Sequence, residues 1–188
     1  MQAIQLSEFA AQQAGAVSVG LLLARLVFGL VFAAHGAQKL FGWFGGYGLA
    51  GTGGFFEKIG FRPGRFFAFA ASASEVAAGV LMALGFAGPV AAALTVAVMF
   101  VAAATVHLGK GFFAATGGFE VPALYSTVAV VLAFTGPGVF SIDAALGLEG
   151  LWSPAVAVGG VAAGVLGGIA ALALRRPAEA VGQASTAA

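Results

Sequence analysis

Residues 17–41 read VSVGLLLARLVFGLVFAAHGAQKLF, a long apolar run with few ionisable side chains. A helix that crosses the roughly 30 Å hydrocarbon core of a bilayer needs about 20 such residues. The ionisable residues in this run are Arg25, His35 and Lys39. The stretch therefore predicts a membrane-spanning helix that carries polar groups into the bilayer.

The composition of the whole chain agrees with this prediction. Of its 188 residues, 61% are hydrophobic and 8% are charged, whereas soluble domains carry about 25% charged residues. A net charge of +1 provides no basic surface for nucleic acid. The lack of cysteine excludes disulfides, thiolate metal sites and cysteine-ligated iron–sulfur clusters. We expect an all-α fold, a polytopic bundle of membrane helices in contact with lipid.

Further stretches have the length and character of membrane spans: residues 65–86, 89–108, 121–140 and 151–174. The first two are separated only by Ala87 and Gly88, and the following Pro89 suits the start of a helix, so they predict a tight antiparallel hairpin. Residues 135–138, TGPG, contain a Gly-Pro pair that can end the 121–140 helix early.

The basic residues predict the orientation. They flank the predicted spans at Lys39, Lys58, Arg62, Arg65, Lys110, Arg175 and Arg176. Positively charged connections stay on the cytoplasmic side. Five spans with the amino terminus outside place every basic connection inside, so we expect a multi-pass protein of the bacterial inner (plasma) membrane with a cytoplasmic carboxy terminus.

Ionisable groups inside a span suggest a buried ion pair. Each costs at least ~2.5–3.5 kcal/mol at the bilayer centre on insertion scales, so each needs a partner or a function. Arg25 shares a helix face with Gly29 and Gly36, which allow a neighbouring helix to approach closely. Glu75 is the acidic residue deep in a span. We expect an Arg25–Glu75 pair, which either fixes helix register or takes part in function.

A second polar group is expected at the cytoplasmic side, where the first and third spans end and the fourth begins. Its members are His35, Lys39, His107, Glu120 and Tyr125. Imidazole and carboxylate groups can exchange protons with a bound redox ligand. The alternative is interfacial anchoring, in which these side chains extend to the lipid head groups.

The same residues do not suit a metal or haem centre. Two histidines at matched depth allow bis-His ligation, but there is neither a haem-attachment motif nor a second pair, so we do not expect haem b. A catalytic zinc would need a third ligand, for which only Glu120 is available. No metal site is predicted.

Two glycine-rich stretches remain. Residues 42–56, GWFGGYGLAGTGGFF, predict an interfacial cover, with a lid over the cytoplasmic pocket as the alternative. In the last span, Gly160, Gly164 and Gly168 recur at four-residue spacing and form a small-residue face for close helix contact. We expect this face to serve as an anchor or as a homo-oligomer contact.

Several motifs together resemble the DoxX family of small membrane proteins. They are RLVFGLVFAAHGAQKLFGWFGGYG (25–48), GTGGFFEKIGF (51–61), SEVAAGVLMALGF (74–86) and GPGVFSID (136–143). The matching family-pattern residues are Arg25, His35, Lys39, Glu75, Ser141 and Asp143. The resemblance implies a four-helix bundle over residues 17–146. Residues 147–176 add a further membrane helix, residues 1–16 precede the bundle as a surface segment, and residues 177–188 form a disordered tail.

Some DoxX relatives are membrane subunits of quinone-linked oxidoreductases. The resemblance therefore implies a subunit that binds quinone, either menaquinone or ubiquinone, and couples a partner oxidoreductase to the membrane quinone pool. Because the chain encodes no electron carrier, it is at most one subunit of such an enzyme. The alternative is a non-enzymatic anchor or assembly factor. A small-solute transporter is a third class, for which the inverted repeats and broken helices typical of transporters are not evident.

Overall fold

The computed structural model describes residues 2–176, and the predicted tail at 177–188 lies outside them. The described chain is helical and contains no strand. Its helices are α1 (Gln2–Phe41), α2 (Gly48–Lys58), α3 (Gly64–Leu84), α4 (Gly88–Ala102), α5 (Glu120–Thr135), α6 (Ile142–Ala145) and α7 (Pro154–Ala173). A π turn, Ala103–His107, continues α4. The predicted all-α membrane bundle is confirmed.

The spans differ from the prediction in length. Helices or helical stretches long and apolar enough to cross a bilayer are Gln13–Phe41, Gly64–Leu84, Gly88–Lys110 and Pro154–Ala173. Helix α5 has 16 residues, or roughly 24 Å at 1.5 Å per residue, and is shorter than the hydrocarbon core. It stops at Thr135 because Gly136 has a φ of 77° and Pro137 follows it. At the other end of the chain, α1 begins at Gln2 instead of near Val17.

Helices α1 and α3 pack together through glycines. A Cβ placed on Gly29 would lie 2.6 Å from the carbonyl oxygen of Gly79, and one on Gly36 would lie 2.6 Å from that of Ser72. Real Cβ atoms essentially never approach this closely, so only glycine fits at either position. The predicted close approach at Gly29 and Gly36 is confirmed. The two contacts also show that α1 and α3 are antiparallel, because the residue number rises along one helix as it falls along the other.

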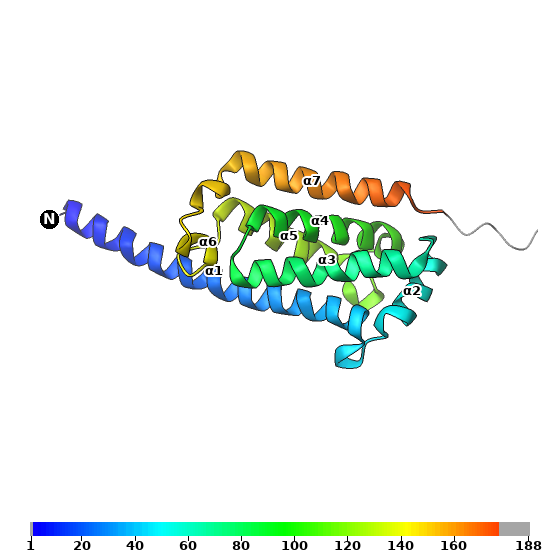
Figure 1. The fold of residues 1–188 in the computed structure, drawn as a ribbon. Coiled ribbons are helices and arrows are strands. Elements are labelled where there is room, and N and C mark those ends of the chain that lie inside the picture. The colour runs from blue at the N-terminus through cyan, green and yellow to red at the C-terminus, as the bar shows by residue number, and fades with distance from the viewer. Residues whose placement is uncertain (1, 177–188) are drawn as a thin grey trace, which may run out of the picture.

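Helix α7 lies against α4 (Figure 1). A Cβ on Gly160 would lie 2.7 Å from the carbonyl oxygen of Pro89, and one on Gly164 would lie 2.6 Å from that of Ala93. Gly168 is equally tight against the ring of Phe100, at 2.8 Å. The predicted small-residue contact is therefore made within the chain. The alternative that these glycines form a homo-oligomer contact is wrong, because α4 of the same chain covers this face.

The two ends of the bundle differ in structure. At one end, α6 and the connection that leads into α7 lie beside α1, which extends further in the same direction (Figure 1). We call this the α6 end. At the opposite end, α2 crosses the bundle (Figure 1), and we call it the α2 end. There, Arg175 Nε donates to the carbonyl oxygen of Ile59 at 2.6 Å, and the amide of Arg176 donates to that of Gly60 at 2.8 Å. The carboxyl end of α7 is thus fastened to the α2–α3 turn.

Large apolar side chains are exposed along the outside of the bundle. Examples on α1 are Leu23, Val27 and Leu30, each more than half exposed. Such surface would be unfavourable in water, and in a bilayer it faces lipid tails. The chain is therefore a multi-pass membrane protein in contact with the lipid bilayer.

Candidate functional site: a cavity beside a buried ion pair

Glu75 of α3 forms an ion pair with Lys39 of α1. Lys39 Nζ lies 2.5 Å from Glu75 Oε1. The Glu75 side chain is 1% exposed, whereas the Lys39 side chain is 37% exposed. The other carboxylate oxygen, Glu75 Oε2, is buried and has no hydrogen-bond partner among the described residues. An unsatisfied buried carboxylate oxygen is costly and calls for a physical explanation.

The predicted Arg25–Glu75 pair is wrong, and the tilt of the side chains explains why. Arg25 lies level with Ala83, whose carbonyl oxygen accepts from Arg25 Nη1 at 3.4 Å. Ala83 is eight residues beyond Glu75, or about 12 Å along α3. Side chains lean toward the amino terminus of their own helix. On antiparallel helices, Arg25 and Glu75 therefore lean apart, whereas Lys39 and Glu75 lean toward each other.

Arg25 instead joins a cluster at the α6 end. Its Nη2 donates to the carbonyl oxygen of Phe140 at 2.5 Å, and the charge of Asp143 acts on it. Asp143 is fully buried; its Oδ1 accepts from the amide of Ala87 at 3.1 Å and its Oδ2 from Trp152 Nε1 at 2.8 Å. We call Arg25, Asp143 and Trp152 the α6-end cluster.

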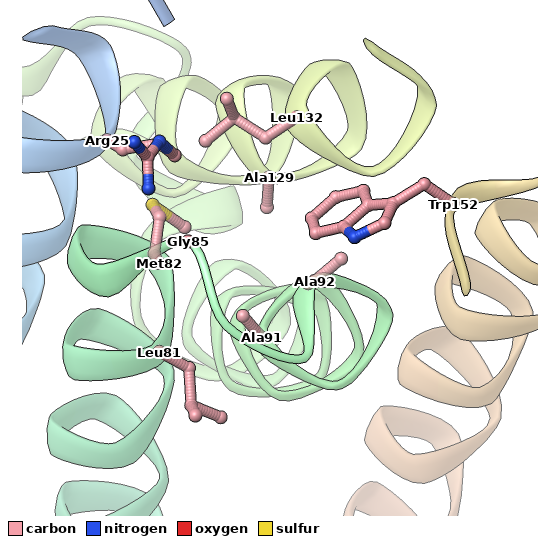
Figure 2. Close-up of a pocket in the computed structure, with 10 residues that line it drawn as sticks. Arg25, Leu81, Met82, Gly85, Ala91, Ala92, Ala129, Leu132 and Trp152 are labelled. Atoms are coloured by element: carbon pink, nitrogen blue, oxygen red, sulfur yellow. The ribbon is translucent and has the colours of Figure 1, made fainter. Parts of the chain in front are cut away.

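The α6-end cluster is closely packed. Arg25 and Trp152 lie on opposite sides of a cavity of about 10 Å³ (Figure 2), which is about the room that one water needs. Ser141, the other family-pattern residue of this region, caps α6 by accepting from the amide of Ala144 at 3.1 Å. The α6-end cluster therefore holds helix ends together, and the cavity that its described residues line is too small for an organic ligand.

The large cavity lies at the α2 end and measures about 800 Å³. Its walls come from α1, α2, α3, α4 with the π turn, and α7. Polar side chains in the walls include Lys39, Thr52, Ser74, Glu75, Thr105 and His107, and aromatic ones include Phe55, Phe56, Phe61 and Phe67. Ligand pockets have volumes of about 300–1,000 Å³ and combine apolar walls with a few polar groups. The cavity meets both criteria.

His107 reaches this cavity at the end of the π turn. Such turns insert an extra residue into a helix and are frequent at functional sites. Its Nδ1 lies 2.7 Å from the carbonyl oxygen of Gly117. Because a carbonyl oxygen only accepts, Nδ1 carries the proton and donates, which leaves Nε2 as the acceptor of the neutral ring. Residues 103–107 thus place a fixed imidazole in the cavity wall.

The structure brings only part of the predicted cytoplasmic pocket together. Lys39 and His107 line the cavity, but the lining residues within the described chain do not include His35, Glu120 or Tyr125. The His35 ring meets that of Tyr125 edge-on, with centroids 6.1 Å apart. Glu120 Oε2 accepts from the amide of Ala114 at 2.7 Å and so holds the connection before α5.

Helix α2 is the part of the site whose helical structure the sequence did not lead us to predict. Residues 42–56 suggested an interfacial cover, but Gly48–Lys58 form a helix that supplies part of the cavity wall. Its glycines permit close packing: a Cβ on Gly53 would lie 2.8 Å from Arg65 Cγ. Thr52 Oγ1 also donates to the carbonyl oxygen of Lys39 at 3.2 Å. The four-residue spacing of Gly48 and Thr52, with Phe55 three further on, was the available signal for a helix.

Comparison with known proteins places the chain in a family. No solved structure matches it. The chain is 31% identical over 125 residues to a protein of Bacillus subtilis (strain 168) named "Putative oxidoreductase CatD", and the match covers 66% of this chain and 85% of that relative. The DoxX family model matches residues 20–108, which contain every wall of the large cavity except α7. The chain belongs to the DoxX family.

Proposed function

We propose that the chain is a membrane subunit that binds a quinone in the large cavity and couples a partner oxidoreductase to the membrane quinone pool. The observation that carries this proposal is the Lys39–Glu75 pair in the wall of a cavity of about 800 Å³. A quinone combines a polar ring with an apolar tail. The cavity offers charged groups for the first and phenylalanine side chains for the second.

The polar groups suit the proton chemistry of a quinone. Reduction to a quinol takes up two electrons and two protons; the partner oxidoreductase, which oxidises its own substrate, supplies the electrons. Lys39 Nζ can donate a hydrogen bond to a ring oxygen. Glu75 and His107 can pass protons to or from the ring oxygens, because carboxyl and imidazole groups exchange protons near neutral pH when suitably placed.

The name of the Bacillus subtilis relative supports the same class of chemistry. It is the name of an oxidoreductase, and the family model covers the part of this chain that holds Lys39, Glu75 and His107. Since this chain has no cysteine, it carries no thiol redox centre of its own, which fits a subunit that relies on a partner for electrons.

The test is the quinone content of the purified wild-type protein. Extraction with organic solvent from protein in mild detergent should yield close to one quinone per chain. A content no higher than that of an unrelated membrane protein, purified from the same membranes, would refute the proposal. It would favour the alternative of a non-enzymatic anchor or assembly factor.

We further propose that the α2 end faces the cytoplasm across the bacterial inner membrane. Basic residues of the described chain support this, since positively charged connections stay on the cytoplasmic side. Those in the connections and helix ends at the α2 end are Lys58, Arg62, Arg65, Lys110, Arg175 and Arg176. A reporter that is active only in the cytoplasm should be active when fused after the carboxy terminus. Activity of a periplasmic reporter at that position would reverse the orientation.

A further inference from the structure

Helix α7 contributes to the large cavity although the DoxX family model ends at residue 108. Gly167 and Ala171 line the cavity together with Ala97 and Val101 of α4. The charged and imidazole groups come instead from α1, α2, α3 and the π turn. The wall formed by α7 is therefore free of polar side chains and suits the apolar part of a ligand.

The glycines of α7 fall into two kinds. Gly160, Gly164 and Gly168 are fixed by packing, because a Cβ on any of them would collide with α4. Gly167 differs: a Cβ there would meet only Ala97 Cβ, at 3.8 Å, which is ordinary van der Waals contact. Helix packing thus does not require glycine at position 167. A side chain there would occupy open space in the cavity.

A second glycine that lines the cavity, on α2, shows the same behaviour. Gly54 of α2 lines the cavity, and a Cβ on it would have no atom within 4 Å. Glycine is unfavourable inside a helix by roughly 1 kcal/mol relative to alanine. Helices α2 and α7 therefore each carry a destabilising residue whose structural effect is to leave the cavity wide.

An independent observation indicates that this space holds a ligand. Glu75 lines the same cavity, is 1% exposed, and keeps Oε2 without a hydrogen-bond partner among the described residues. The ties from Arg175 and Arg176 to the α2–α3 turn hold the end of α7 beside Ile59, another lining residue. Both walls are thus fixed in position around the open space.

We propose that Gly167 keeps open a channel along α4 for the isoprenoid tail of the quinone, so that α7 selects the ligand by its tail. This inference rests on the proposed function. The ring lies at Lys39, Glu75 and His107, and the tail lies along the apolar cavity wall that α4 and α7 form side by side (Figure 1). Helix α7 is then part of the binding site in addition to being a membrane span.

The test compares Gly167→Leu with the matched variant Gly159→Leu. Both add the same side chain to α7, but Gly159 is outside the cavity lining and a Cβ on it would have no atom within 4 Å. Binding is measured for a long-chain quinone and for a quinone with a single isoprene unit. Gly167→Leu should lower the affinity for the long-chain quinone by at least about tenfold, because the added side chain and the tail would compete for the same space. The affinity for the short-chain quinone should stay nearly unchanged. Gly159→Leu should bind both like the wild type.

The outcomes separate this inference from the proposed function. Wild-type protein that binds neither quinone refutes the proposed function. If the wild type binds both quinones and Gly167→Leu binds both as well as the wild type does, the tail channel alone is refuted. The same holds if Gly167→Leu binds neither quinone. Gly167→Ala adds a single methyl group in ordinary contact and serves as the variant that should still fold. Its affinity for the long-chain quinone should lie between those of the wild type and Gly167→Leu.

Discussion

Replacing Asp143 with leucine is expected to lower the free energy of unfolding by about 2–6 kcal/mol, because two donors lose their acceptor at a cost of about 1–3 kcal/mol each. Asp143 is fully buried, accepts hydrogen bonds from the Ala87 amide and the Trp152 indole, and lies within electrostatic range of Arg25. Its loss leaves two donors without an acceptor and a buried guanidinium without a counter-charge. Thermal unfolding in detergent should show a clear fall in the melting temperature.

Two matched variants identify the cause. Asp143→Asn keeps an acceptor oxygen but removes the charge, so its loss of stability should be smaller than that of the leucine variant. Arg25→Met combined with Asp143→Leu removes both charges and should recover part of the loss, because apolar replacement of a buried pair is often tolerated. An Asp143→Leu protein that melts like the wild type would show that the α6-end cluster does not hold the bundle together.

The membrane helices could be predicted from the sequence because hydrophobic length and glycine spacing are local signals. The run at 17–41 and the Gly88-Pro89 hairpin needed no knowledge of tertiary contacts. The contact of Gly29 and Gly36 with α3 followed from their shared face with Arg25. Local signals also located the break after Thr135, although not its effect of shortening the helix to 16 residues.

The partners of the charged residues could not be predicted in the same way. Sequence spacing gives the depth of Arg25 and Glu75 in the membrane. The direction in which each side chain leans, however, decides which residue it contacts. Arg25 leans toward the α6 end, where Asp143 lies, and Lys39 leans toward Glu75. Taking this tilt into account would have favoured Lys39 as the partner of Glu75.

The full extent of the large cavity could not be predicted either, for a different reason. It depends on α2, whose glycines suggested a loop, and on α7, which has no ionisable residue to mark it. Depth alone grouped His35, Glu120 and Tyr125 with Lys39 and His107. These three are not among the described residues that line the cavity: His35 meets Tyr125, and Glu120 binds its own connecting segment.

Replacing Glu75 with glutamine should reduce quinone affinity by at least about tenfold. A hydrogen bond that involves a charged group contributes about 1.5–3 kcal/mol. A loss of about 1.4 kcal/mol of binding free energy corresponds to a tenfold lower affinity. Lys39→Met should have a similar effect, because it removes the donor and leaves the Glu75 carboxylate without its ion-pair partner. Lys39→Met combined with Glu75→Leu should fold and yet bind no quinone, which separates loss of the site from loss of stability.

His35→Phe is the control that distinguishes the cavity from the pocket that depth alone suggested. His35 is exposed and is not among the described residues that line the cavity. An aromatic ring at this position can keep the edge-on contact with Tyr125. This variant should therefore retain the wild-type quinone content.

The central claim is that the cavity beside the Lys39–Glu75 pair holds a quinone, and its most direct test is the quinone content per folded chain of three proteins purified together. The account predicts close to one quinone per chain in the wild type and in His35→Phe, and about half of that or less in Glu75→Gln, because a nearly full site whose affinity falls tenfold is left about half occupied. Equal quinone content in Glu75→Gln and the wild type would contradict it.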